Sequence, residues 1–148
     1  MAFTEITLVK QASDLVVDHY IGNFNNDKAN ITPAGVIPFG TVVFRAKGLG
    51  IEAPWAAVKL DADIADTNEY AVVYGDHYGF KYDFTPKAIK AKFFNAVVIK
   101  RGPVMLKEFY IKAVHGTALA TKYGVLKQLL ADQGVVVLDD VTNFKGTL

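Results

Sequence analysis

The sequence predicts an α+β protein that is mainly β: a compact mixed-sheet or barrel-like body, one amphipathic helix at about residues 118–132, and an extended N-terminal arm. Aromatic residues occupy every second position from Tyr78 to Phe84, which is the period of a β-strand. Apolar residues between 119 and 130 recur at spacings of three and four, which is the period of a helix. Apolar runs at 41–46, 70–74 and 135–138 indicate further strands.

The totals favour one soluble domain. A chain of 148 residues can enclose a single core, and we divide it into an arm (1–30), a β-rich domain (31–140) and a C-terminal tail (141–148). Sixteen basic and fifteen acidic residues are interspersed, which argues against a nucleic-acid partner. Cysteine is absent, which excludes disulfides, zinc–thiolate sites and thiol catalysis. We find neither a membrane-spanning run nor a signal peptide, so we expect no membrane partner, no secretion and a cytoplasmic origin.

The N-terminal arm holds two apolar runs followed by a loop rich in Asn and Gly at residues 22–27. An apolar segment on a loose link often packs on something other than its own domain. The alternative, an edge strand of the body's own sheet, is equally consistent with the pattern. The candidate contact residues of the arm are Phe3, Ile6, Leu8, Val9, Leu15 and Val17.

Turn residues separate the strands of the body. Pro and Gly at 33–35 and at 38–40 predict turns before the strand at 41–46. The segment 49–70 is irregular and acidic from Asp61 to Glu69. The strand at 70–74 follows it, and Pro86 ends the aromatic strand.

A long strand begins at Phe93 and is interrupted by Gly102-Pro103. Because proline cannot donate to a sheet ladder and fixes its own φ, this pair must form a bend, a bulge or a sheet edge. We expect the strand to continue beyond it, through Ile111.

The predicted helix follows that strand. Thr117 and Thr121 are candidate N-caps, and Gly134 is a natural residue to end the helix because it enters the left-handed region without a Cβ penalty. Gly124 costs the helix about 1 kcal/mol relative to alanine, so the helix depends on packing against the sheet.

The chain contains no recognisable catalytic or nucleotide-binding motif. His19, His77 and His115 lack the spacing of a metal site, and the single serine, Ser13, has no nucleophile motif around it. The carboxylates at 61, 63 and 66 lack the glycine and distal glutamate of a calcium loop. We therefore expect no enzymatic activity, no catalytic residues, no metal and no cofactor.

The aromatic strand allows two interpretations. A face formed by Tyr78, Phe80, Tyr82 and Phe84 could stack on sugars, but such a face more often lies in a core or a subunit interface, because each ring buries roughly 150–250 Å². The residues that we single out for subunit or surface contacts are Trp55, Tyr78, Phe80 and Tyr82.

The order of these parts resembles the head decoration proteins of tailed bacteriophages, the lambda D-like capsid-stabilising family. The resemblance covers about residues 31–140, and its most telling piece is the helix closed by Gln133-Gly134 and three valines. The aromatic segment 78–84 and the added length between strands depart from the family pattern. The matching segments are 37–43, 70–74, 96–104, 123–131 and 133–137.

This resemblance implies a structural virion protein that binds the outer surface of an assembled phage capsid as a homotrimer and cements it. Its partners would be the major capsid protein and two further copies of itself, with the N-terminal arm laid on the shell. The alternative function is a carbohydrate-binding or tail-associated adhesion module that uses the aromatic strand face 78–84.

Overall fold

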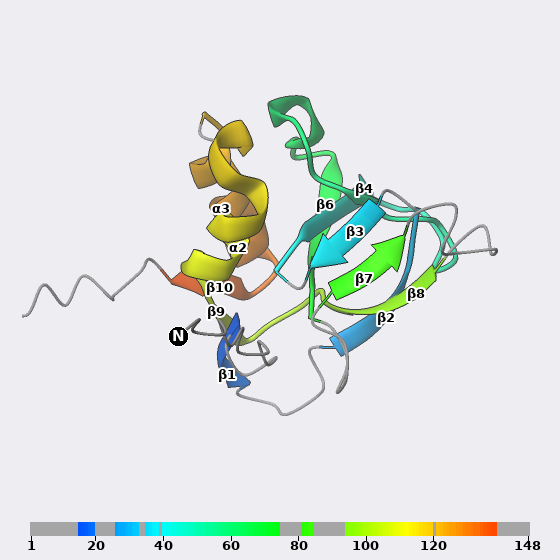
Figure 1. The fold of residues 1–148 in the computed structure, drawn as a ribbon, viewed down its shortest axis with the longest axis horizontal. Helices are drawn as coiled ribbons and strands as arrows, with labels where there is room; N and C mark the ends of the chain where they lie inside the picture. Colours follow the sequence, from blue (N-terminus) through cyan, green and yellow to red (C-terminus); the bar gives the residue numbers. More distant parts are fainter. Residues whose placement is uncertain are drawn as a thin grey trace, which may run out of the picture.

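The protein is an α+β structure with more strand than helix, built around a curled sheet (Figure 1). The structure is a computed structural model that describes residues 15–19, 26–32, 35–38, 40–74, 81–84, 94–119 and 121–138. The strands are β1 (Val16–His19), β2 (Asn26–Ile31), β3 (Gly35–Pro38), β4 (Val42–Ala46), β5 (Ala56–Ala57), β6 (Asn68–Val73), β7 (Lys81–Phe84), β8 (Phe94–Ile99), β9 (Val104–Lys107) and β10 (Val135–Leu138). The helices are η2 (Asp61–Asp63), α2 (Glu108–His115), η3 (Gly116–Leu119) and α3 (Tyr123–Asp132).

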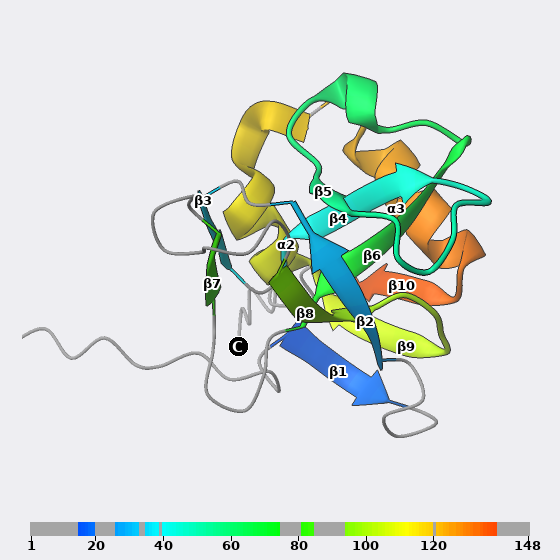
Figure 2. The same cartoon turned by 90° about the vertical axis from the view of Figure 1, so that its right-hand side faces the viewer.

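These strands form three sheets. Five strands in the order β2-β8-β6-β4-β5 make a curled sheet, here called the half-barrel, in which the described ladders are antiparallel. A second sheet has the order β1-β9-β10, and β3 pairs with β7 in a separate two-stranded ribbon. The helices α2 and α3 lie together beside the half-barrel and above the β1-β9-β10 sheet (Figure 1). In Figure 2 the β3–β7 ribbon lies to the left of the half-barrel strands.

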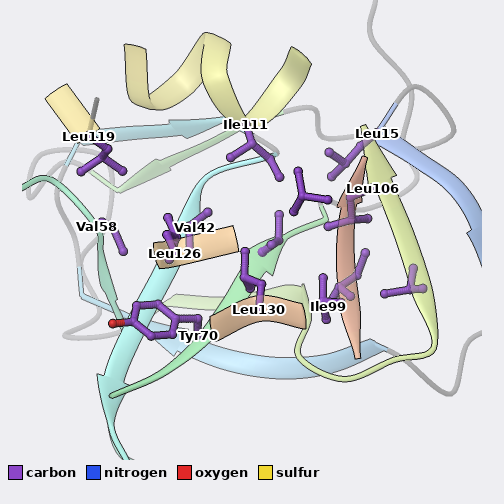
Figure 3. Close-up of a cluster of buried hydrophobic side chains, with 14 of the residues drawn as sticks. Leu15, Val42, Val58, Tyr70, Ile99, Leu106, Ile111, Leu119, Leu126 and Leu130 are labelled. Atoms are coloured by element: carbon purple, nitrogen blue, oxygen red, sulfur yellow. The ribbon is translucent and has the colours of Figure 1, made fainter. Parts of the chain in front are cut away.

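Two apolar clusters hold these layers together. The larger cluster lies where α2 and α3 meet both sheets and includes Leu106, Ile111, Leu126 and Leu130 (Figure 3). The smaller cluster lines the other face of the half-barrel. Neighbouring residues of β6 alternate between the two, because successive side chains of a strand point to opposite faces. The members of the smaller cluster are Ala29, Ile31, Ile37, Val43, Trp55, Ala71, Val73, Ala96 and Val98.

Several sequence predictions are confirmed. The strands expected at 41–46 and 70–74 are β4 and β6 with ends shifted by one or two residues, and β10 has the predicted bounds. Gly102-Pro103, whose peptide bond is cis, separates two strands that belong to different sheets. Gly134 has a φ of 85°, the left-handed conformation expected at the end of the helix.

The helical region differs from the prediction. The helix expected at about 118–132 is two elements, η3 and α3, and α3 begins after Lys122 with no side-chain cap at its N-terminus. The strand expected to run through Ile111 ends at Lys107, where α2 begins. Phe109, Tyr110 and Ile111 have strand-like propensity. Yet Glu108, Ile111 and His115 share one buried helical face, so packing outweighs propensity here.

The boundary of the arm also differs. Residues 16–19 form β1, which pairs antiparallel with β9, and residues 26–31 form β2 of the half-barrel. These parts of the segment 1–30 are therefore edge strands of two different sheets. Residues 1–14 and the tail from 139 onward lie outside the described residues.

Candidate functional site at the mouth of the half-barrel

The inner face of the half-barrel changes from apolar to charged at one end. Alternation along each strand places Arg45, Glu69, Lys100 and Asp27 on the face that carries the smaller apolar cluster. Each lies two residues beyond an apolar member of that cluster. These four side chains define the charged end that we call the mouth of the half-barrel.

Arg45 organises the mouth. Its guanidinium is almost fully buried and donates hydrogen bonds to the Glu69 carboxylate and to the carbonyls of Gly50 and Ala53, the latter two at 3.2 Å. It also lies over the Trp55 ring, 4.4 Å from the centroid. The planar fork of arginine suits this combination of a carboxylate, carbonyls and an aromatic face. Arg45 thereby fastens the loop 47–53 to the strand floor.

Glu69 accepts from two cations. Its second carboxylate oxygen lies 3.0 Å from Nζ of Lys100. Burial by itself would raise the pKa of Glu69, but the hydrogen bonds from Arg45 and Lys100 and their positive charges outweigh burial and lower it. Glu69 is therefore ionised at neutral pH and shared between two positive groups.

Trp55 forms the floor of the mouth and closes the half-barrel. Its backbone N–H donates to the carbonyl of Asn30 at 2.8 Å, and its carbonyl accepts from the N–H of Thr32 at 2.9 Å. These bonds form a parallel bridge between Ile31 and Trp55, so the two edges of the curled sheet meet at this point. The Trp55 side chain is 2% exposed.

A hollow of about 290 Å³ opens at this mouth. Its walls come from β2, β4, β8 and the loop 47–53, and Leu49 and Ile51 stand exposed on that loop. Asp27 on the wall is paired with Arg101 at 2.8 Å. Within the described part of the chain, Lys28 has no ion-pair partner. The lining residues are Asp27, Lys28, Arg45, Leu49, Ile51, Trp55, Val98 and Lys100.

The structure places two of the sequence-predicted contact residues inside the protein. Leu15 is fully buried in the larger cluster, and Trp55 is buried in the smaller one. Val17 belongs to β1. Tyr82 lies in β7 opposite Ile37. The predicted contact residues Phe3, Ile6, Leu8, Val9, Tyr78 and Phe80 lie outside the described residues.

Sequence reasoning missed the mouth. Its signal is a charged residue at an inward position of an otherwise apolar strand, as in Val43-Phe44-Arg45. That signal becomes visible once the register is known. The strand pairing brings Arg45 opposite Glu69, and the curl of the sheet brings both to Trp55.

Asp63 and Glu108, which lie away from the mouth, make hydrogen bonds and ion pairs that stabilise the fold. Asp63 accepts from the backbone N–H groups of Lys59 and Leu60, at 2.8 and 3.0 Å, so this acidic loop residue orders its own turn. Buried Glu108 lies 3.2 Å from Lys112 and 3.5 Å from Lys127, which ties α2 to α3. Across the described ranges, no three His, Asp or Glu side chains gather as metal ligands would.

The comparisons with known proteins give no relative: no family model, no curated protein and no solved structure matches this chain. Among the described helices, none combines the length and the apolar character required to cross a membrane.

Proposed function

We propose that this chain is a structural virion protein that binds the outer surface of an assembled tailed-phage head as a homotrimer and stabilises it. The resemblance to lambda D-like decoration proteins motivates the proposal. It does not require a catalytic site, because stabilisation follows from binding the assembled shell and not its free subunits.

One structural observation supports the proposal most directly. β1 is held to the body by antiparallel pairing with β9, and fully buried Leu15 anchors its start. The residues before it include the apolar candidates Phe3, Ile6, Leu8 and Val9. A partner bound by this segment would therefore be coupled to a packed body through a fixed strand.

Three such segments on one trimer would act together. A single short apolar segment binds weakly, but three on one rigid trimer meet neighbouring shell sites at high effective concentration, and avidity can exceed a single contact by about 10²- to 10⁴-fold. The arm in this proposal comprises residues 1–14, because Leu15 belongs to the core.

The test combines mass measurement with sedimentation. Light scattering on the eluting protein should give three times the 16.2 kDa chain mass. The full chain should co-sediment with undecorated tailed-phage heads from its own source and raise their resistance to heat. Deletion of residues 1–14 should leave the circular dichroism spectrum and unfolding midpoint unchanged while abolishing co-sedimentation. A monomer that leaves the heads unaffected would refute the proposal.

A further inference from the structure

Beside the hollow, one edge of β2 is left uncovered by the strands that the structure describes. β2 pairs with β8 along its whole length, Asn26 to Ile31. Its other edge is paired at residues 30–32 by Trp55, and among the described residues no strand covers that edge at 26–29. A strand edge with unpaired N–H and C=O groups is a template for an added strand.

The charge around the hollow is positive. Lys28, Arg45 and Lys100 line it against one lining carboxylate, Asp27, which is already paired with Arg101. Beneath them Glu69 neutralises one of the two cations that it contacts. A further carboxylate, Glu52, is held at the rim by Asn30 at 3.3 Å. Arg45 is almost fully buried, whereas Lys28 is exposed and Lys100 is partly exposed, so these two lysines are the lining cations that a ligand can reach.

The rim of the hollow is apolar and held in place. Ile51 is 80% exposed and Leu49 is half exposed, although each would gain from burial. Their loop is fixed by Arg45 through the carbonyls of Gly50 and Ala53. A fixed loop that presents two large apolar side chains loses little conformational entropy when a partner covers it.

We propose that this hollow binds an extended acidic peptide segment of a partner protein. The peptide pairs with the edge of β2 at residues 26–29 that no described strand covers, sets carboxylates near Lys28 and Lys100, and packs an apolar side chain against Leu49 and Ile51. The inference deepens the proposed function, on which it rests for the identity of the partner as a shell protein.

The size of the hollow favours a peptide over a metabolite. Pockets that enclose a small molecule usually span about 300–1,000 Å³ and bury most of it. This hollow lies at the lower limit, at about 290 Å³, and its apolar rim is open to solvent. It can take one or two side chains, while the backbone edge of β2 supplies the remaining hydrogen bonds.

Trp55 offers a direct assay because it is the single tryptophan of the chain and lines the hollow. The probe is the capped peptide acetyl-Thr-Glu-Val-Glu-Ile-Thr-amide, titrated into the full chain at low salt. We expect a saturable change in Trp55 fluorescence with a dissociation constant on the order of 1 mM or below. The same peptide with glutamine for both glutamates should bind at least about threefold more weakly.

Paired variants separate the hollow from the general surface. Ile51→Ser and Lys100→Gln should each weaken binding about three- to fivefold. Leu60→Ser and Lys59→Gln are the matched controls, and Leu60 is exposed as Ile51 is, at 64%. Both should leave binding unchanged, because neither residue lines the hollow. Glu52→Gln should strengthen binding, because it removes a negative charge from the rim.

The proposal is overturned if the fluorescence of Trp55 does not respond, if the glutamine peptide binds equally well, or if sodium acetate alone reproduces the full response. Equal effects of Ile51→Ser and Leu60→Ser would also overturn it. Failure here with intact head binding would refute the peptide site alone. If the protein binds the peptide but does not bind phage heads, the proposed function is refuted and the peptide site is retained.

Discussion

The side-chain amide of Gln133 pairs with the backbone of Tyr70 as a neighbouring strand would. Oε1 of Gln133 accepts the Tyr70 N–H at 2.9 Å, and Nε2 donates to the Tyr70 carbonyl at 2.7 Å. Nε2 also donates to the carbonyl of Lys100 at 2.8 Å, just past the end of β8. Gln133, the residue that ends α3, therefore supplies the hydrogen-bond partners of β6 at Tyr70. The ladder between β6 and β8 does not supply them, because it begins at Val72.

Removal of this amide should be costly. Gln133→Ala leaves three backbone groups in a partly buried joint without their partner, and we expect it to lower the free energy of unfolding by about 2–4 kcal/mol. Urea unfolding measures the change. Gln128→Ala is the matched control: its amide contacts exposed Asp132 at 3.0 Å, and the cost should stay within about 0.5 kcal/mol. Equal losses for both variants would contradict the bridging role.

The contact between Gly102 and Gly134 should tolerate no side chain at position 102. A Cβ there would lie 1.8 Å from the Gly134 carbonyl oxygen, and Gly102 N–H donates to the Gln133 carbonyl at 3.0 Å in the same joint. We expect Gly102→Ala to destabilise by about 3 kcal/mol or more, because backbone must move. Gly124→Ala, in open space within α3, should instead stabilise by about 1 kcal/mol. Thermal unfolding of both variants decides the prediction.

His115 should make the fold sensitive to mild acid. Burial lowers the pKa of His115 to about 4, although a hydrogen bond to the Val58 backbone opposes the shift, and Nε2 accepts the Val42 N–H at 2.8 Å. The unfolded chain, with an ordinary histidine pKa of 6.5, binds the proton first as pH falls. Stability is therefore lost between pH 6.5 and about 4, by about 3 kcal/mol in total, and levels off below.

The variant His115→Gln isolates this effect. Its carboxylates titrate as in the parent, so the difference between the two unfolding curves reports His115 alone. We expect the stability of the parent, relative to the variant, to fall as pH drops through this window. A pH-independent difference would show that the imidazole does not titrate as its burial implies.

Glu69 should be necessary for the architecture of the mouth. Glu69→Gln leaves buried Arg45 and half-buried Lys100 without their shared negative charge, and we expect a loss of about 3 kcal/mol by urea unfolding. Asp132→Asn, an exposed acid outside any ion pair in the described ranges, is the control and should change little. Because the pKa of Glu69 is lowered, its stabilisation is present at neutral pH and is lost as pH falls below the ordinary value of 4.5. A Glu69→Gln protein with parental stability at pH 7 would contradict this account.

The sequence alone determined the parts whose physical cause is local. Valine runs predicted β4 and β10, glycine predicted the left-handed end of α3, and proline predicted the break between β8 and β9. The α+β, mainly β class follows from the two-residue period of the strands and the three-to-four-residue period of the helix. Local propensity also misled at Phe109–Ile111, where three strand-favouring residues lie in a helix because Glu108, Ile111 and His115 bury one face together.

Tertiary structure alone decided the candidate site. Arg45, Glu69 and Lys100 are separated by up to 55 positions, and nothing in their local sequence states that they meet at Trp55. The register of the half-barrel and the closure of its edges by Trp55 bring them together. The burial of Leu15 has the same cause. Its apolar character indicated that it would be buried, but the pairing of β1 with β9 decided that it is buried in the core of this chain and not against a partner.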